Sequence, residues 1–363
     1  MREPKPYNAY IDRILPFDDY GCEINRIPVS DLFDSYFLNG FIYPKKMERL
    51  APFMSTVESN WERLLDLGEE AIQIFTHRDA ETGLATITRF RSTASGWVAQ
   101  HLVSNHAIGS GVVMLAAQAR NLSQEPFASN QHWFRASNRY ANRIFGSITE
   151  TIDPSHADVS EYHLVLAPKD LSGVGTRTSP STPLRNLFTI VPIDEPSPDL
   201  KRLVLRVRGP VYFQAEELGG PDLELAFLNR LFGTVGLFRY RRVWLAYARQ
   251  SNHVVGAAIV YRGPLGMNFS MLENRCDLII APELDSWERA GLSQDFLDAI
   301  LPEYGSFEPG FAPVVTDGET ARCLVHLGGE MIRRYKQGIW LRPGFEGWYR
   351  HVAGFYRRVF SRL

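Results

Sequence analysis

Two glycines one residue apart, Gly109 and Gly111, stand where an alternating apolar segment gives way to an apolar-periodic one, in the stretch SNHAIGSGVVMLAAQARN. A glycine-containing turn from strand to helix exposes backbone N–H groups at the positive end of the helix dipole, an arrangement that binds phosphate. The same glycines would also relieve crowding in a tight turn. A Rossmann motif is excluded because Met114 stands where its third glycine is needed, and no Lys-Ser or Lys-Thr follows to make a P-loop. A phosphate cradle and a tight turn both remain open.

A second stretch, NRYANRIFG at 138–146, begins about 27 residues after Gly111. Together the two stretches resemble the GNAT acyltransferase superfamily, which has a Gln/Arg-x-x-Gly-x-Gly/Ala motif at the start of a helix and an N-x-x-A-x-x-L-Y-like pattern on a later helix. Here His106 stands in place of the Gln or Arg, and Phe145 in place of the common tyrosine. The positions that match are Gly109, Gly111, Asn138, Ala141 and Ile144.

The resemblance implies that the loop amides hold the pyrophosphate of an acyl-coenzyme A and that the later helix flanks its pantetheine arm. Coenzyme A or acyl-coenzyme A is therefore the expected cosubstrate, without a metal. The cofactor-binding residues implied in this way are His106, Ile108, Gly109, Ser110, Gly111, Val112, Asn138, Asn142 and Phe145.

GNAT enzymes transfer an acyl group directly from a thioester to an amine, without a covalent enzyme intermediate. A general base takes the proton of the amine, and a tyrosine often protonates the leaving thiolate. Phe145 cannot donate a proton, so Tyr140 on the same predicted helix is the substitute. By position, the candidate bases are His101, Glu150 and Glu161. A histidine on a strand is also a common interior residue, which leaves a structural interpretation of His101 open.

Composition excludes several classes of protein. A net charge of −2 provides no global basic field for nucleic acid, and no apolar run approaches the ~20 residues of a membrane span. The N-terminal segment lacks the apolar core of a signal peptide. The cysteines are too far apart for a disulfide framework or a thiolate zinc site, and the histidines are not spaced as paired metal ligands. We therefore expect a cytoplasmic protein without a metal.

The elements that must position these residues follow from the hydrophobic pattern. Residues 71–79 and 84–92 flank a short turn and predict a hairpin, and residues 96–105 predict the strand that runs into the glycine pair. Strands are also predicted at 132–136 and 160–168, with a helix at 137–147 between them. Behind the glycine pair, helical spacing relates Val112, Leu115, Ala116, Ala119 and Leu122.

The same order returns in the second half of the chain. The pattern predicts a hairpin, a strand, a helix, a strand and a helix at 243–250 and 254–263, 274–283, 286–301, 311–317 and 318–335. Corresponding elements lie roughly 170–180 residues apart, which indicates duplication of a domain. The expected fold class is α/β, with two tandem GNAT-like domains that are each a mixed twisted sheet flanked by helices. We expect a GNAT-like domain at 1–168, a Pro-rich linker at 169–202 and a degenerate GNAT-like domain at 203–363.

The equivalent turn of the second domain, APELDSWERAGL, has no glycine pair, and its carboxylates Glu283, Asp285 and Glu288 would repel an anion. Coenzyme A is therefore expected in the first domain, while the second shapes the acceptor pocket or stabilises a homodimer. We expect the basic aromatic tail WYRHVAGFYRRVFSRL to dock on the second domain rather than to contact a membrane or an acidic partner.

Two functions remain open at this point. The first is an acyl-coenzyme A-dependent N-acyltransferase acting on a small-molecule amine, with an acyl carrier protein as the alternative acyl donor. The second is a non-catalytic GNAT-like module that binds a phosphate-bearing ligand, such as a signalling nucleotide, or a protein partner.

Overall fold

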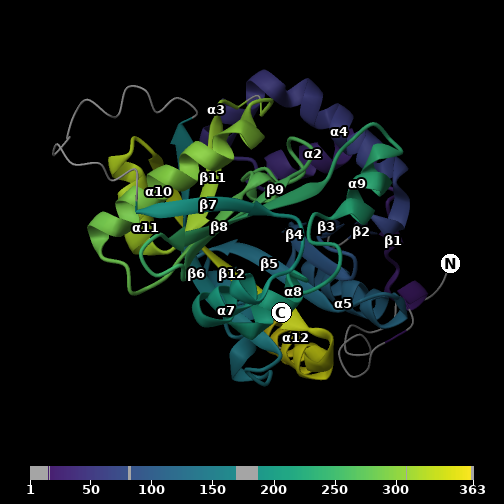
Figure 1. Cartoon of the computed structure of the whole chain (residues 1–363). Coiled ribbons are helices and arrows are strands. Elements are labelled where there is room, and N and C mark those ends of the chain that lie inside the picture. The colour runs from purple at the N-terminus through teal and green to yellow at the C-terminus, as the bar shows by residue number, and fades with distance from the viewer. Residues whose placement is uncertain (1–14, 16, 81–82, 169–186, 308, 361–363) are drawn as a thin grey trace. The chain divides into compact units, whose positions relative to one another are not determined.

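The computed structural model describes residues 15, 17–80, 83–168, 187–307 and 309–360 (Figure 1). Its contacts divide the chain into two compact units. Unit 1 comprises Met1–Ala51, Trp61–Val159 and Gln337–Leu363, and unit 2 comprises Pro52–Asn60 and Ser160–Lys336. These limits differ from the domains expected at 1–168 and 203–363, because the last residues of the chain join unit 1. The domain boundaries drawn from the sequence stay a prediction.

The sheet of unit 1 has the strand order β1-β2-β3-β4-β5, followed by the end of β12. Neighbours from β1 to β4 are antiparallel, and β4 is parallel to β5, with helix α5 as the crossover. The predicted hairpin and the strand that follows it are confirmed. The strands are β1 (Glu23–Ile24), β2 (Ile72–Asp79), β3 (Gly83–Arg91), β4 (Gly96–Ser104), β5 (Ser129–Arg135) and β12 (Glu330–Leu341).

Helices cover this sheet, and α5 packs its predicted apolar stripe into the core. Val112, Leu115, Ala116 and Ala119 are buried, whereas Leu122 is 53% exposed at the end of the helix. The helices that lie wholly in unit 1 are α2 (Val29–Leu38), α3 (Pro44–Leu50), α5 (Ala107–Ser123), α6 (Arg139–Ile144) and α12 (Phe345–Phe360). Helix α4 (Met54–Asp66) belongs to unit 1 from Trp61 onward.

The C-terminal helix α12 completes the core of unit 1, where Figure 1 shows it in yellow beside α5. Its side chains Trp348, Val352 and Tyr356 are fully buried in the same cluster as the stripe of α5. The indole Nε1 of Trp348 donates a hydrogen bond to Gln118 Oε1 at 2.6 Å. The expectation that this tail docks on the second domain is wrong, since its apolar face is buried against α5.

The sheet of unit 2 has the order β6-β11-β10-β9-β8-β7, with β10 and β11 parallel and the other neighbours antiparallel. Strand β7 ends this order, and an edge strand tolerates its residue Pro192, which has no N–H to donate. The strands are β6 (Ala157–Pro168), β7 (Phe188–Ile193), β8 (Tyr240–Ala248), β9 (Val254–Arg262), β10 (Cys276–Ile280) and β11 (Phe311–Thr316).

The helices of unit 2 are α7 (Pro198–Val207), α8 (Gly209–Ala215), α9 (Ala226–Gly233), α10 (Ser286–Ile300) and α11 (Gly318–His326). Part of the expected Pro-rich linker at 169–202 therefore forms β7 and the start of α7, and the part at 169–186 lies outside the described residues.

The helix predicted over 318–335 is too long. It ends at His326 because Gly328 adopts a φ of 88°, which breaks the helix before β12 begins at Glu330.

Each unit thus contains an antiparallel hairpin, a further antiparallel strand, a helix and a strand parallel to the one before the helix. In unit 1 these elements are β2 to β5 with α5, and in unit 2 they are β8 to β11 with α10. The expected α/β fold, with two tandem mixed sheets flanked by helices, is confirmed.

Candidate functional site

In unit 1, the parallel strands β4 and β5 are paired over the first part of β4 and then separate. Their register runs from Gly96↔Ser129 to Ala99↔His132, while β4 itself continues to Ser104. Helix α5 starts beyond the end of β4 at Ala107. The separating strands form a fork that opens toward the beginning of this helix.

A bulge on β4 lies at the same point. Thr86 pairs with Val103 and Thr88 pairs with Gln100, so two residues of β4 oppose one residue of β3. The first of these two residues of β4 is His101, whose φ is 56°. Bulges re-aim side chains and end strand pairing, and they are frequent beside active sites.

The side chain of His101 is an interior group of unit 1. It is 3% exposed, and its ring lies 5.3 Å from Tyr36, 4.9 Å from Phe41 and 5.7 Å from Trp61, measured between ring centroids. Burial, with the nearby charge of Lys46, holds the pKa of His101 well below its ordinary value. An imidazole enclosed in this way is not placed to take a proton from an incoming amine, which favours the structural interpretation of this residue.

Both glycines lie among the first five residues of α5 rather than in the turn before the helix. His106 is the N-cap of the helix, and its Nδ1 accepts a hydrogen bond from the backbone N of Ile108 at 3.2 Å. Gly109 and Gly111 follow as helical, buried residues. The first-turn amides of a helix have no partner within the helix and face its N-terminal end. One of these amides, that of Ile108, donates to the imidazole of His106.

Ser110, between the two glycines, joins α5 to two other helices. Its Oγ lies 3.2 Å from Tyr140 Oη on α6 and 3.4 Å from Tyr356 Oη on α12, and the two tyrosine oxygens are 2.5 Å apart. We call these three hydroxyls the Ser110 cluster. Burial raises the pKa of Tyr140 and raises that of Tyr356 well above the ordinary value. Both phenols therefore stay protonated at neutral pH.

The two asparagines of the predicted cofactor set have local roles in α6. Asn138 is the N-cap of the helix, and its Oδ1 accepts a hydrogen bond from the backbone N of Ala141 at 3.1 Å. Asn142 Nδ2 donates to the backbone oxygens of Ala136 and Asn138, each at 2.8 Å. These bonds fix the start and the orientation of α6, which carries Tyr140.

The remaining predicted residues are divided between the core and the surface. Phe145 stacks on His132 with ring centroids 4.2 Å apart, and Val112 is 1% exposed in the core. Glu150 is exposed on the short helix η4 (Ile148–Glu150). Glu161 lies in unit 2, where it pairs with Arg334 at 3.0 Å. The structure thus brings Ser110 and Tyr140 together and leaves both glutamates outside the Ser110 cluster.

In unit 2 the corresponding helix start is closed by its own carboxylates. Asp285 Oδ1 accepts hydrogen bonds from the backbone N of Trp287 at 2.9 Å and of Glu288 at 2.8 Å. In return, Glu288 Oε2 accepts from the backbone N of Asp285 at 3.1 Å, which completes a capping box. Because the Asp285 carboxylate already accepts from these two first-turn amides of α10, a phosphate would have to displace it.

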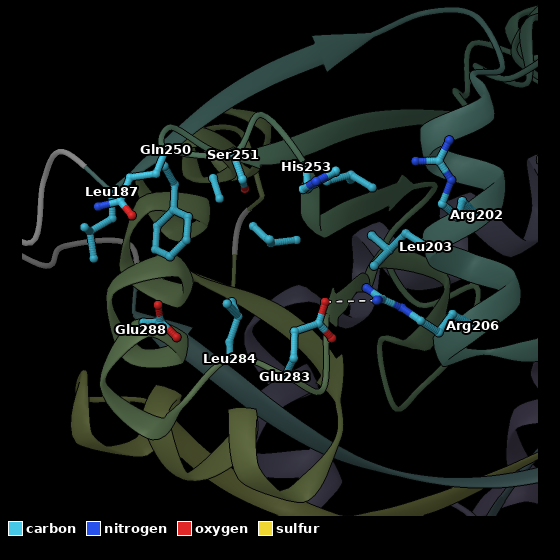
Figure 2. Close-up of a pocket in the computed structure, with 14 residues that line it drawn as sticks. Leu187, Arg202, Leu203, Arg206, Gln250, Ser251, His253, Glu283, Leu284 and Glu288 are labelled. Carbon is cyan, nitrogen blue, oxygen red and sulfur yellow. Dashed lines mark hydrogen bonds and ion pairs between the residues drawn. The ribbon is translucent and has the colours of Figure 1, made fainter.

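A hollow of about 580 Å³ lies beside the start of α10 (Figure 2). Two charged residues that line the hollow form an ion pair, in which Arg206 Nη1 lies 2.9 Å from Glu283 Oε1. Their charges therefore neutralise each other. Its apolar floor includes Phe188, Leu203, Val254, Val255 and Leu284. None of the predicted site residues lines this hollow.

Unit 2 also buries a network of charged side chains. Arg275 lies 2.9 Å from Asp277 and 3.1 Å from Glu216, and Tyr212 Oη donates to Asp277 Oδ2 at 2.7 Å. These side chains are buried. Since each charge faces an opposite charge or a hydrogen-bond donor, the network holds the sheet of unit 2 to α8 and the segment after it.

Among the described residues, no group of His, Cys, Asp and Glu side chains is arranged to hold a metal ion. None of the helices in the described ranges is long and apolar enough to cross a membrane.

Sequence reasoning missed Tyr356, which completes the Ser110 cluster from the far end of the chain. Its only signal was the helical spacing of aromatic residues in the C-terminal segment, where Trp348, Phe355 and Tyr356 are buried. That spacing predicts a buried face but does not identify its partner.

Neither a protein-family model nor a curated protein sequence matches the chain. Solved structures resemble it over most of its length. A Drosophila protein is 14% identical, with 92% of this chain and 99% of that chain covered at a TM-score of 0.41. A tandem GNAT protein from the clavulanic acid biosynthesis pathway is 14% identical, with 88% and 98% covered and a TM-score of 0.41. N-myristoyltransferase of Saccharomyces cerevisiae, with bound myristoyl-CoA, is 11% identical, with 93% and 84% covered and a TM-score of 0.38. These likenesses concern the fold alone.

Proposed function

We propose that the chain is an acyl-coenzyme A-dependent N-acyltransferase whose unit 1 holds the pyrophosphate of coenzyme A at the start of α5. The observation that carries the proposal is the 3.2 Å contact between Ser110 Oγ and Tyr140 Oη. This contact joins the first turn of α5 to α6 beside the fork of β4 and β5. The two stretches that resemble GNAT motifs therefore meet at one place in the fold.

The electrostatics of the two helix starts support a site in unit 1. A helix N-terminus carries a partial positive charge and free amides, both of which favour an anion. On α5 the cap is the imidazole of His106, which accepts from a single amide. On α10 the carboxylate of Asp285 accepts from two amides. In this proposal the pyrophosphate replaces the imidazole and binds the amides of Ile108 and Gly109, while α10 remains closed.

The chemical step is a direct transfer. The nitrogen of the acceptor amine attacks the thioester carbon, a C–N bond forms, and the C–S bond breaks. The ammonium proton passes to a base, and the leaving thiolate takes a proton from Tyr140. The raised pKa of Tyr140 keeps that proton in place before the reaction. Tyr356, 2.5 Å away, is then the nearest group that can return a proton to Tyr140. Among the candidate bases, Glu150 is exposed in unit 1.

A second candidate function is a non-catalytic module that binds a phosphate-bearing ligand at the same amides. The burial of His101 among aromatic rings favours it, because the base expected on β4 is then absent from the fork. Both functions place an anion at α5, and they differ in whether a thioester is cleaved.

Two measurements on one panel of ligands distinguish these functions. A ligand that binds only the folded state raises its melting temperature, so coenzyme A, acetyl- and palmitoyl-coenzyme A and cyclic dinucleotides are compared by thermal shift. Release of free thiol is then followed with a panel of small amines. We expect stabilisation by coenzyme A and amine-dependent thiol release. Stabilisation without thiol release favours the non-catalytic module, and no stabilisation by any coenzyme A species contradicts the site.

The role of Tyr140 is tested by Tyr140→Phe, with Tyr240→Phe in unit 2 as the matched control. Loss of a general acid lowers kcat by roughly 100-fold or more. We expect this loss in Tyr140→Phe with unchanged affinity for coenzyme A, and no loss in the control. Full activity of Tyr140→Phe would remove Tyr140 from the mechanism.

A further inference from the structure

A pocket of about 450 Å³ opens between α6 and α12 in unit 1. Two of the residues around it are arginines, and no carboxylate is among the described residues that line it. The rest of its lining is polar or apolar but uncharged. The lining residues are Asn142, Arg143, Ser147, Phe355, Arg358 and Val359.

This pocket lies next to the Ser110 cluster. The ring of Phe355, which lines the pocket, meets the ring of Tyr140 edge-on with centroids 5.6 Å apart. Tyr140 in turn reaches Ser110 in the first turn of α5. A ligand whose pyrophosphate binds at α5 would therefore place its neighbouring groups close to the two arginines.

The charges on the surrounding elements are mainly positive. Arg139 lies on α6, and Arg357 and Arg350 lie on α12. Arg350 is paired with Glu346 at 3.7 Å, within the same helix. Glu150 is the acidic residue on the nearby η4. A phosphate group would thus enter a region with an excess of cationic side chains.

Arginine suits this role because its planar guanidinium presents several N–H donors in a fixed fork that matches phosphate oxygens. The apolar side chains Phe355 and Val359 beside the arginines suit the face of a nucleoside. Coenzyme A carries, besides its pyrophosphate, a phosphomonoester on the 3′ oxygen of its ribose. A cationic pocket that lies beside a pyrophosphate site would bind this 3′-phosphate.

We propose that Arg143 and Arg358 bind the ribose 3′-phosphate of coenzyme A, in a subsite that α6 and the C-terminal helix α12 build together. This inference rests on the proposed function, because it requires coenzyme A at α5. It adds that α6 and α12 each supply one arginine to the subsite. These two helices are far apart in the sequence, since 216 positions separate Tyr140 on α6 from Tyr356 on α12.

The test compares coenzyme A with 3′-dephospho-coenzyme A by isothermal titration of the full chain. The variants are Arg143→Ala, Arg358→Ala and the double variant, with Arg350→Ala on α12 as the matched control. Charge-assisted hydrogen bonds of this kind correspond to a change of about tenfold in affinity at moderate salt. Circular dichroism and the melting temperature establish that each variant is folded.

We expect the wild type to bind dephospho-coenzyme A about tenfold more weakly than coenzyme A, and the double variant to bind both ligands equally. The Arg350→Ala control should keep the discrimination. Equal binding of the two ligands by the wild type would overturn the subsite and leave the proposed function intact. Discrimination that survives in the folded double variant would also overturn it. Failure of coenzyme A itself to bind the wild type would overturn both the subsite and the proposed function.

Discussion

Tyr140 Oη lies 2.5 Å from Tyr356 Oη, although 216 positions separate the two residues in the sequence. The first belongs to α6 and the second to the C-terminal helix α12, and both contact Ser110 in the first turn of α5. Because the candidate site of unit 1 includes this contact, the final segment of the chain is part of that site and of the core beneath it.

We expect the Ser110 cluster to contribute measurably to the stability of the fold. We expect Tyr356→Phe to lower the free energy of unfolding by about 1 kcal/mol, because it removes a buried hydroxyl and leaves the ring in place. Urea unfolding of Tyr356→Phe, Tyr140→Phe and the double variant gives the coupling between the two hydroxyls. Strictly additive effects would show that the two phenols do not interact in solution.

The buried histidines His132 and His101 should make the free energy of unfolding depend on pH. Burial lowers the pKa of His132 from its ordinary value near 6.5 to about 3. The unfolded chain therefore binds one more proton than the folded chain between these two values. Stability is fully present above pH 6.5 and falls as the pH decreases toward 3, with a slope of up to about 1.4 kcal/mol per pH unit from this residue. His101, whose pKa is also lowered, acts in the same direction.

The variant His132→Gln checks this assignment. It can keep the polar contact with Asn130, whose Nδ2 lies 2.8 Å from His132 Nε2. Chemical denaturation at pH 7, 6, 5 and 4 should show a shallower loss of stability in the variant than in the wild type. Parallel pH profiles would mean that His132 titrates normally in the folded protein.

The buried and exposed ion pairs of the chain should differ strongly in their effects. Arg239 Nη2 lies 2.6 Å from Glu273 Oε2, and both side chains are 1% exposed. Glu273→Gln leaves a buried, unpaired guanidinium, so we expect a loss of about 3–5 kcal/mol. The control is Asp31→Asn, which breaks a pair with Arg78 whose side chains are 48% and 54% exposed. We expect that change to cost less than about 1 kcal/mol. Similar losses in the two variants would contradict this account of unit 2.

Local pattern predicted much of the fold. Alternation of apolar residues predicted β2, β3 and β4, and helical spacing predicted the buried stripe of α5. The strand–helix–strand order of both units also follows from such patterns. These features depend on neighbours a few residues apart, which a single sequence displays directly.

Long-range partners could not be predicted in the same way. The apolar face of α12 indicates burial, but only the packed structure shows that α5 covers it. The helix predicted at 318–335 also ran too far, because Gly328 ends α11 and β12 begins at Glu330. For the candidate site, the stretches that meet at Ser110 and Tyr140 were identified, whereas Tyr356 and the burial of His101 depend on residues distant in the chain.

The most direct test of the central claim is isothermal titration of coenzyme A into the wild type and His106→Asp. Asp at this N-cap would accept hydrogen bonds from the amides of Ile108 and Gly109, as Asp285 does on α10. Because Asp is a favoured N-cap and suits the helix dipole, the variant should be as stable as the wild type or more stable by up to about 1 kcal/mol. Its carboxylate would nevertheless occupy the amides that the pyrophosphate needs. We predict one coenzyme A per wild-type chain and a loss of at least about tenfold in affinity in His106→Asp. Unchanged binding by a folded His106→Asp, or two equal sites per chain, would contradict the assignment of coenzyme A to the start of α5.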